Sequence, residues 1–449
     1  MKGDISIALR TARPSHVKVA IASLIGTAIE WYDFFLYGTA AALIFNKLFF
    51  PAFDPTIGTL LAFATYAVGF VARPLGGLVF GHYGDTIGRK TMLYLTLLIM
   101  GVSTAAIGLL PTYNTLGIWA AVVLIACRLI QGFALGGEWG GAVLMAFEYA
   151  PADKKGFYGS WPQLGAPIGL VLGTLVFSIF SAIMSDAQFV AWGWRLPFLF
   201  SIVLVIVGLW IRFTLAESPE FQKVKETKQE VRMPIIDAIR MYPKNILLAM
   251  GARFAENGFF YIYATFVLAY ATQALGMKRQ DILNGVLIAA FIEAFTIPAF
   301  GALSDKLGRR PVYISGAIFS ALMSFPLFML LGTKTPQLGW IAIVLGLAVG
   351  HAAMYGPQAS FLSELFGTKV RYSGVSLGYN LASIFAGALS PIIATGLMAA
   401  YKPATWPISV YMTILALITL VSVYFAGETR KGAEKGDVTS GGLGPEETT

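Results

Sequence analysis

The chain has 449 residues, of which 57% are hydrophobic and only 12% are charged. Soluble globular domains carry about 25% charged residues, so this composition cannot supply the polar surface that a soluble protein of this size needs. Together with a mean hydropathy of +0.70, it excludes a soluble globular protein and indicates a membrane protein that crosses the bilayer many times.

The formal net charge of +8 does not indicate a nucleic-acid partner. The basic residues are spread in twos and threes between apolar segments, whereas nucleic-acid binding needs a concentrated basic face. The single cysteine, Cys127, excludes an intrachain disulfide. The first apolar segment is longer than the core of a signal peptide, so we expect it to be retained as a membrane helix.

Twelve apolar segments are long enough to cross a hydrocarbon core of about 30 Å. They cover 17–44, 56–82, 91–111, 116–148, 156–183, 195–215, 245–275, 282–303, 311–332, 339–365, 373–400 and 405–426. We therefore expect an all-α membrane protein with twelve transmembrane helices. Its parts are an N-terminal segment 1–16, a six-helix bundle 17–215, a central loop 216–244, a second six-helix bundle 245–426 and a disordered tail 427–449.

The positions of the basic residues predict the orientation of the chain. The loops on the side of the N-terminus, the central loop and the tail carry most of the Lys and Arg residues, and the opposite loops carry few. Because cytoplasmic loops are enriched in these residues, both termini should be cytoplasmic. We expect a multi-pass protein of the inner (cytoplasmic) membrane that works as a monomer in the lipid bilayer.

Three motif pairs occur in the same order in the two halves. The loop Gly81 to Lys90 after the second segment matches the loop Gly301 to Arg310 after the eighth. In addition, Glu148 with Lys155 corresponds to Glu364 with Arg371, and Glu217-Ser-Pro corresponds to Glu428-Thr-Arg. A repeat of six plus six spans is typical of transporters that work by alternating access.

The two loops follow the pattern GxxxDxxGR[KR], which resembles the signature of the major facilitator superfamily. Three further runs resemble its metabolite:proton symporter family: EWYDFFLYG from Glu30, RLIQGFALGGEWGG from Arg128 and GWRLPF from Gly193. The resemblance covers about residues 17–430. It implies two six-helix bundles that import a small metabolite, such as shikimate, 2-oxoglutarate, citrate, proline or betaine, together with a proton.

Ionisable residues within the predicted spans are candidates for function, because each costs at least ~2.5–3.5 kcal/mol to insert. Five carboxylates stand against three arginines: Glu30, Asp33, Glu138, Glu256 and Glu293 against Arg73, Arg128 and Arg253. At least two carboxylates therefore lack a fixed cation and are candidates for proton binding near neutral pH.

The resemblance implies a proton site in the first half. In the related proton-coupled sugar porters an aspartate of the first span faces an arginine of the fourth, and Asp33 and Arg128 hold the matching positions. Glu30 lies three residues earlier on the same helical face and is the competing site. Glu293 is another candidate. Whether the coupling ion is a proton or sodium stays open.

Arg253 and Glu256 form an i, i+3 pair in the seventh segment. Arg253 is a natural bidentate receiver for a substrate carboxylate, unless the two residues form a private structural pair. Spans 1, 4, 7 and 10 line the pathway in the superfamily. Polar residues of these spans and of spans 5 and 11 are further substrate-binding candidates: Tyr37, Gln131, Gln163, Asn257, Tyr355, Gln358 and Asn380. We expect Arg73 to pair with Glu138. His351 is a single histidine, which excludes a metal site, and we expect it to be a hydrogen-bonded cavity residue rather than a proton relay.

Charges at the ends of the repeated spans predict a cytoplasmic gate. In the sugar porters the matching residues form ion pairs that hold the bundles together in the outward-facing state; the alternative is that they only fix topology. The candidates are Gly81, Asp85, Gly88, Arg89, Glu148 and Lys155 in the first half, and Asp305, Gly308, Arg309, Glu364 and Arg371 in the second.

Other functions fit the sequence less well. An exporting antiporter should carry a Gly-Pro pair followed by paired glycines in the fifth span, and the run from Gln163 to Gly169 lacks both. A membrane enzyme is disfavoured because the sequence has no HExxH motif or nucleophile elbow, and we expect no cofactor, metal or catalytic site. The Gly-rich tail cannot form the coiled coil of osmosensing betaine carriers, which favours an organic acid over a zwitterion as the substrate.

Overall fold

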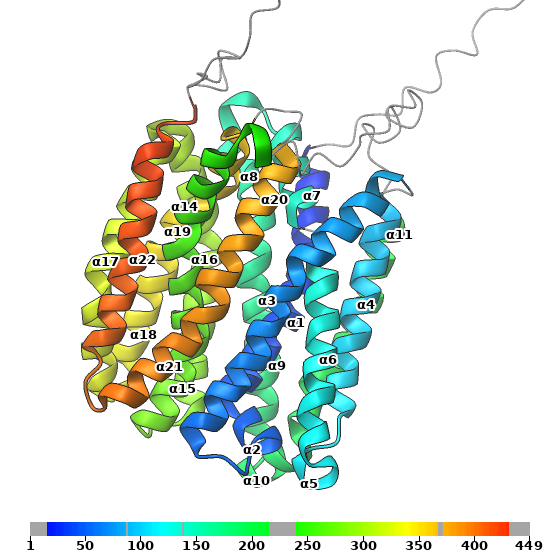
Figure 1. Cartoon of the computed structure of the whole chain (residues 1–449), viewed down its shortest axis with the longest axis vertical. Helices are drawn as coiled ribbons and strands as arrows, with labels where there is room; N and C mark the ends of the chain where they lie inside the picture. The colour runs from blue at the N-terminus through cyan, green and yellow to red at the C-terminus, as the bar shows by residue number, and fades with distance from the viewer. Residues whose placement is uncertain (1–15, 87–88, 137–138, 215–238, 367–370, 431–449) are drawn as a thin grey trace, which may run out of the picture.

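The computed structural model describes residues 16–86, 89–136, 139–214, 239–366 and 371–430. Within these ranges the chain is helical apart from short connections, and they contain no strand. Figure 1 shows the helices running side by side along the long axis of the molecule, with the first half on one side and the second half on the other. The predicted all-α architecture is confirmed.

The first half contains long helices joined by short ones. The long helices are α1 (His16–Leu43), α3 (Pro55–Thr86), α4 (Arg89–Leu109), α6 (Ile118–Leu135), α7 (Trp139–Tyr149), α9 (Gly165–Ile183) and α11 (Arg195–Thr214). The short ones are α2 (Phe45–Phe49), α5 (Tyr113–Leu116), η1 (Ala152–Lys154), α8 (Lys155–Gly159), η2 (Pro162–Leu164), α10 (Asp186–Gln188) and η3 (Phe189–Gly193).

The second half repeats this arrangement with several π-helical turns inside its spans. Its helices are α14 (Pro243–Tyr261), α15 (Val267–Ala269), α16 (Arg279–Leu307), α17 (Arg309–Gly332), α18 (Pro336–Val344), α19 (Ala352–Glu364), α20 (Arg371–Ala382), α21 (Leu389–Tyr401) and α22 (Trp406–Ala426). The π turns are η4 (Ile262–Phe266), η5 (Tyr270–Ala274), η6 (Leu345–His351) and η7 (Ser383–Ala388). Such turns occur frequently at functional sites.

In the described part of the chain, nine helices are long and apolar enough to cross a membrane, and a bent pair, Asp186–Gly193 with Arg195–Trp210, makes a tenth. Each of the twelve predicted segments is mostly helical where it is described, with turns at 117, 136 and 160–161 inside the fourth and fifth. The third includes the shorter apolar helix Tyr94–Leu109, and the seventh is less apolar because α14 carries several polar side chains. The count of twelve spans and the cytoplasmic termini stay predictions. The N-terminal segment and most of the central loop and tail lie outside the described residues.

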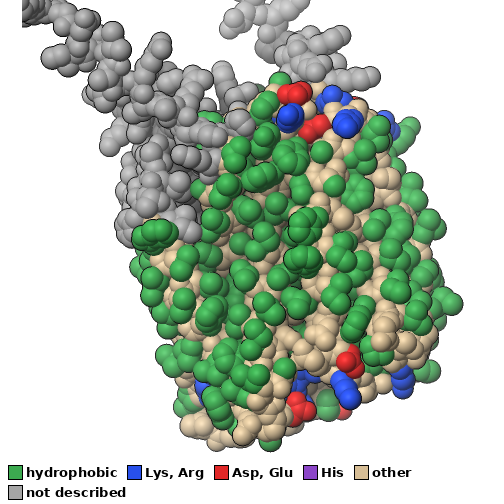
Figure 2. Space-filling view, turned by 180° about the vertical axis from the view of Figure 1, so that it is seen from behind, with side chains coloured by type: hydrophobic (Ala, Val, Ile, Leu, Met, Phe, Trp, Pro, Cys, Tyr) green, Lys and Arg blue, Asp and Glu red, His purple; other side chains and the backbone are tan. Residues whose placement is uncertain are grey.

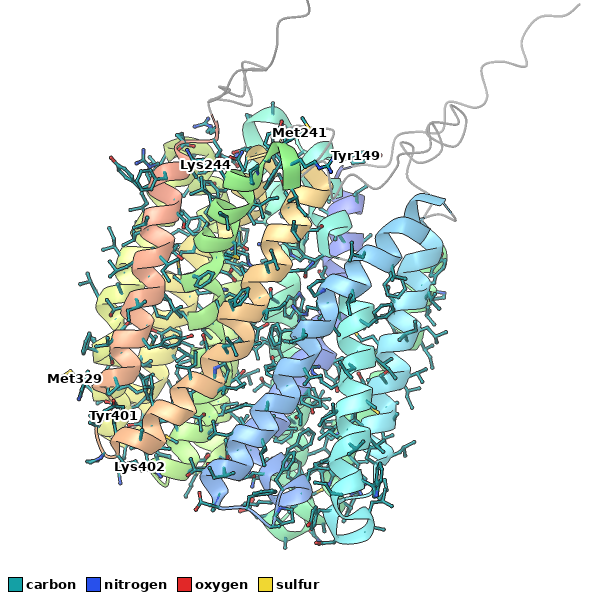
Figure 3. All side chains as sticks on the ribbon, viewed as in Figure 1. Tyr149, Met241, Lys244, Met329, Tyr401 and Lys402 are labelled. Carbon is teal, nitrogen blue, oxygen red and sulfur yellow. The ribbon has the colours of Figure 1, made fainter. Side chains whose placement is uncertain are left out.

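The molecular surface is that of a protein surrounded by lipid. Figure 2 shows hydrophobic side chains over the middle of the face and charged ones gathered toward its ends. Large apolar side chains such as Leu322 and Met329 are 70% and 73% exposed. Lys244 and Lys402 lie at opposite ends of the molecule (Figure 3). Within hydrocarbon, the helical backbone satisfies its own hydrogen bonds. The apolar side chains around it meet the lipid without exposing polar groups.

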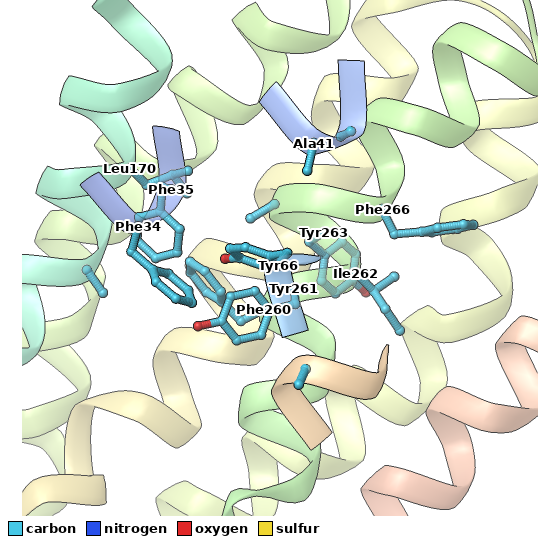
Figure 4. Packing of buried hydrophobic residues seen from close by; sticks show 14 of the residues in the cluster. Phe34, Phe35, Ala41, Tyr66, Leu170, Phe260, Tyr261, Ile262, Tyr263 and Phe266 are labelled. Atoms are coloured by element: carbon cyan, nitrogen blue, oxygen red, sulfur yellow. The ribbon is translucent and has the colours of Figure 1, made fainter. Parts of the chain in front are cut away.

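Aromatic side chains join the two halves at the centre. Tyr261 of α14 lies 6.1 Å from Phe34 of α1 and 5.2 Å from Phe70 of α3, measured between ring centroids (Figure 4). Phe35 of α1 similarly packs 5.2 Å from Phe260. This cluster fills the space between the bundles, so polar groups beside it are shielded from water.

Helices α3 and α6 approach each other closely through glycines. A Cβ atom on Gly132 would lie 1.9 Å from the carbonyl oxygen of Gly69, and one on Gly76 would lie 1.7 Å from that of Phe133. Small residues let helix backbones approach closely in membranes. This contact sets the positions of Arg73 on α3 and Arg128 on α6.

Adding a methyl group at Gly132 should therefore push the two helices apart. We expect Gly132→Ala to lower the melting temperature of the detergent-solubilised protein clearly, because overpacking typically costs about 1–3 kcal/mol. The matched control is Gly396→Ala, since a Cβ on this helical glycine would meet nothing within 4 Å. Equal melting temperatures for both variants would contradict the close contact between α3 and α6.

Candidate functional site

A small cavity of about 10 Å³, roughly the room that one water molecule needs, lies at the interface between the halves. Its lining is aromatic with a few ionisable groups: Trp31, Phe35, Ala166, Arg253, Glu256, Asn257, Phe260, Tyr261, His351, Tyr355 and Tyr379. Four of the predicted substrate-binding residues are among them. Because the lining comes from α1 and α9 of the first half and from three spans of the second, any movement between the halves alters the cavity.

The cavity is closed at the end that carries the predicted cytoplasmic gate. Arg309 Nη1 lies 2.7 Å from Asp305 Oδ1, and Arg309 Nη2 lies 3.3 Å from Glu364 Oε1. The Asp305 carboxylate also accepts hydrogen bonds from the backbone N–H groups of Gly156 and Phe157, both at 2.8 Å. The two backbone hydrogen bonds therefore hold Asp305 of the second half against α8 of the first, while the ion pairs with Arg309 lie within the second half.

Glu428 is a further residue of this gate, and sequence reasoning gave it no role. Its carboxylate accepts hydrogen bonds from the backbone N–H groups of Arg309 and Arg310 at 2.9 and 3.0 Å. Gly308 has a φ of +104°, and a Cβ there would lie 2.5 Å from Glu428 Oε2. The correspondence between Glu217-Ser-Pro and Glu428-Thr-Arg was the available signal, because a carboxylate is favourable at a helix N-terminus.

The other gate candidates are less well defined. The Lys155 ammonium lies 4.7 Å from the centre of the Phe147 ring, and the Lys155 carbonyl accepts a hydrogen bond from Ser360 at 2.8 Å. The structure does not describe the remaining candidates at side-chain level: Gly81, Asp85, Gly88, Arg89, Glu148 and Arg371.

The opposite end of the molecule is closed as well. Arg279 forms an ion pair with Asp186 across the halves, with Nη2 to Oδ1 at 3.2 Å. Gln280 donates a hydrogen bond to Ser178, and the Thr59 hydroxyl donates to Gln273 Oε1 at 3.1 Å. In the part of the chain that the structure describes, the two halves are therefore in contact at both ends.

Two of the three guanidinium nitrogens of Arg253 bind neighbouring protein groups. Its Nε lies 3.0 Å from Glu256 Oε2, and its Nη1 donates to the Tyr379 carbonyl and the Ser383 hydroxyl, both at 2.8 Å. The guanidinium also lies 3.4 Å from the centre of the Tyr379 ring. Arg253 and Glu256 are thus paired in this structure, and both also line the cavity.

His351 connects two carboxylates that sequence reasoning treated separately. Its Nδ1 contacts Glu293 Oε1 at very short range, and its Nε2 lies 3.3 Å from Glu256 Oε1. The other Glu256 oxygen accepts from Gln358 Nε2 at 2.8 Å, and the same amide lies 3.0 Å from the Tyr313 hydroxyl. His351 is hydrogen-bonded at the cavity, as predicted, but no periodicity in the sequence indicated its contacts with Glu256 and Glu293.

Asp33 and Arg128 do not form the expected ion pair in this structure. Asp33 is 1% exposed, and its Oδ1 has no hydrogen-bond partner. Arg128 instead donates to Gln131 Oε1 at 3.1 Å, and Gln131 donates to Thr104 at 2.7 Å. The physical reason is that the Arg128 guanidinium stacks against aromatic rings, which lie 4.3 to 4.8 Å away and belong to Phe34, Tyr37 and Tyr66.

Arg73 is buried with unused donors. Its side chain is 3% exposed, and neither Nε nor Nη2 has a hydrogen-bond partner. The guanidinium lies 4.4 Å from the Phe34 ring centre and 4.5 Å from that of Phe70. Its expected partner, Glu138, lies outside the described residues. Buried polar groups are almost always satisfied, so donors left without a partner point to a missing acceptor.

The remaining candidates are buried polar groups between the helices. Gln163 accepts from Trp139 Nε1 at 3.0 Å and donates to Gln358 at 3.4 Å, which links the halves. Asn257 donates to Ser383 at 3.5 Å, but its Oδ1 has no partner. The predicted sites Tyr37, Glu30 and Asn380 are also buried; Tyr37 donates to Thr65 at 2.7 Å.

Comparisons with known proteins agree with this architecture. A family model described as Major Facilitator Superfamily matches residues 23–391. A shikimate transporter of Escherichia coli (strain K12) is 42% identical over 418 residues, which cover 92% of this chain and 95% of that protein. A proline/betaine transporter of the same strain is 36% identical over 431 residues, which cover 93% of this chain and 85% of that protein.

The fold is also found among solved structures. The crystal structure of a D-xylose–proton symporter matches with a TM-score of 0.69 and 19% sequence identity, covering 93% of this chain and 99% of that one. The family model spans most of the chain, and the relatives match it over nearly their full lengths. The chain therefore belongs to the Major Facilitator Superfamily and is a multi-pass membrane transporter, not an enzyme.

Proposed function

We propose that this transporter imports a small organic acid together with a proton, across the inner membrane, by alternating access. The observation that carries the proposal is the central cavity, which lies between the halves, is closed at both ends and is lined by Arg253, Glu256 and His351. A closed cavity of this kind is where substrate sites lie in transporters built from repeats. Ionisable groups at this depth are costly to insert, and those that occur there usually have a function.

Two observations favour an organic acid as the substrate. The shikimate transporter matches this chain at 42% identity over 95% of its own length, and Arg73 has two buried donors without partners near the cavity. A zwitterion of the proline or betaine type is the second candidate, because aromatic rings and the Glu256 carboxylate in the cavity lining suit a cationic group. The proline/betaine transporter is the less similar of these two relatives.

The substrate carboxylate has a better receiver in Arg73 than in Arg253. Arg253 already contacts Glu256, a carbonyl and a hydroxyl, whereas Arg73 Nε and Nη2 are free to form a bidentate pair. Arg73 also lies 5.6 Å from the ring of the cavity residue Trp31. We therefore assign the carboxylate to Arg73 and a supporting role to Arg253.

Asp33 remains the proposed proton site of the first half. Its carboxyl group is buried and its Oδ1 has no hydrogen-bond partner among the described residues. Burial disfavours the charged form, while Thr104 and Arg128 nearby act in the opposite direction. Glu30 lies on the same helix and is the competing group.

Transport into proteoliposomes tests the function. We expect labelled shikimate to accumulate when the outside is acidic, and accumulation to stop when a protonophore is added or when only a sodium gradient is present. Parallel assays with 2-oxoglutarate, citrate and betaine identify the substrate class. Asp33→Asn should abolish accumulation but retain exchange, because the neutral side chain resembles the protonated carboxyl. Accumulation by this variant at the wild-type level would move the proton site elsewhere.

A comparison of two arginine variants tests the carboxylate receiver. Arg73→Lys should raise the apparent KM roughly tenfold or more, because a point charge replaces a planar fork with two donors. Arg253→Lys should affect the melting temperature more than the KM, since Arg253 holds Glu256 and Ser383. The reverse order of KM effects would return the carboxylate to Arg253.

Weakening the predicted cytoplasmic gate tests alternating access. Arg309→Ala removes the partner of Asp305 and Glu364, so it should shift the population toward the inward-facing form. Single cysteines placed on either side of the cavity, in a Cys127→Ser background, should then label faster from the cytoplasm and more slowly from outside. Lys306→Ala is the control, because this exposed residue lies next to Asp305 in the last turn of α16. Labelling that Arg309→Ala leaves unchanged would mean that these charges only fix topology.

A further inference from the structure

We infer that the second half holds its own proton-binding site, in which His351 is an imidazolium that bridges Glu256 and Glu293. The inference deepens the proposed function, because it names a second group that couples protons to movement of the cavity. The three side chains are 1%, 3% and 0% exposed, respectively. They come from three different spans: His351 ends the π turn η6, Glu256 lies on α14 and Glu293 lies on α16.

The number of protons follows from the geometry. Each ring nitrogen of His351 faces a carboxylate oxygen, Nδ1 toward Glu293 and Nε2 toward Glu256. A carboxylate only accepts hydrogen bonds, so each contact needs one proton. A neutral ring carries one N–H and leaves its other nitrogen facing an acceptor, lone pair against lone pair. Both contacts are satisfied together, with both acids ionised, only when the ring carries two protons.

The charges that surround the ring favour this state. Arg253 of α14 pairs with Glu256, so two cations and two carboxylates cancel when the imidazole is charged. The other titratable groups nearby are tyrosine hydroxyls: Tyr261 on α14, Tyr313 on α17, Tyr355 on α19 and Tyr379 on α20. The first half contributes Trp31, Phe35 and Ala166 to the cavity, none of which titrates. A neutral sum is the favourable arrangement for buried charges in a membrane.

Loss of the proton should open one particular contact. If the contact with His351 breaks, Glu256 still contacts Arg253 and Gln358 through its Oε2. Glu293 has no such replacement, because its Oε2 has no hydrogen-bond partner among the described residues. The contact between His351 and Glu256, at 3.3 Å, is therefore the one that breaks. This contact joins η6 to α14, and both elements line the cavity. Deprotonation thus loosens the cavity wall.

The charge of His351 can be measured directly, without a substrate. The protein has only three histidines, so ¹⁵N-histidine labelling in lipid bilayers gives few signals, and His351→Gln identifies the one that belongs to His351. We expect both ring nitrogens of the wild-type protein to be protonated at about pH 7. A neutral wild-type ring at this pH would overturn the proposal.

Glu293→Gln tests the proton count with an isosteric change. The Gln amide can donate a hydrogen bond to Nδ1, so both contacts of the ring are satisfied when the ring is neutral and carries one proton fewer. We expect the His351 signal to change to the neutral form in this variant. The matched control is Asp281→Asn on the same helix, which should leave the signal unchanged. A charged ring in Glu293→Gln would also overturn the proposal.

Exchange of labelled shikimate connects the site to transport. In an Asp33→Asn background the exchange rate should still depend on pH, and adding Glu293→Gln should make it flat. A dependence that persists in the double variant would exclude coupling through this chain. If the wild-type protein accumulates no substrate in a proton gradient, the proposed symport fails. The charge of His351, measured in the absence of substrate, is a separate result.

Discussion

The structure depends on how the charges of buried ionisable side chains are balanced at the centre of the molecule, between the two halves. In the second half the balance is nearly complete: Arg253, Glu256, His351 and Glu293 form one connected set of contacts. In the first half it is not, because Arg73 and Arg128 are held by aromatic rings and keep donors without acceptors. A buried donor without a partner costs about 1–3 kcal/mol. An anion that enters between the halves would recover this free energy, which is a physical reason for an acid to bind here.

The aromatic cluster makes such an imbalance possible. Phe34 lies between the two guanidinium groups, 4.4 Å from that of Arg73 and 4.3 Å from that of Arg128. An aromatic face attracts a cation but supplies no hydrogen-bond acceptor. The rings therefore stabilise two neighbouring arginines without satisfying their donors. Contacts at both ends of the molecule keep water out, and a low dielectric strengthens every charge interaction at the centre.

Much of the fold and part of the site could be predicted from the sequence. The twelve segments are mostly helical where described, because their apolar length leaves no other solution in hydrocarbon. Asp305, Arg309 and Glu364 were found because their motif occurs twice, and the Arg253–Glu256 pair because i and i+3 share a helical face. The contacts of His351 with Glu256 and Glu293 depend on tertiary packing between three spans, which no local pattern encodes. The absent Asp33–Arg128 pair has a similar origin, since nearby rings compete for the guanidinium.

The two halves repeat each other in sequence motifs but not in their charges, and the proposed mechanism needs this asymmetry. The first half has hydrogen-bond donors without acceptors, so it can bind an anion. In the second half the charged groups already contact one another, so it can bind or release a proton only when one of these contacts breaks. If the substrate carboxylate completes the first half while a proton completes the second, the loaded centre has few uncompensated charges. Such a centre can pass through the occluded form at low cost, because burial penalises net charge most. A centre loaded with only one of the two keeps an uncompensated charge, and this difference in free energy would couple substrate movement to proton movement.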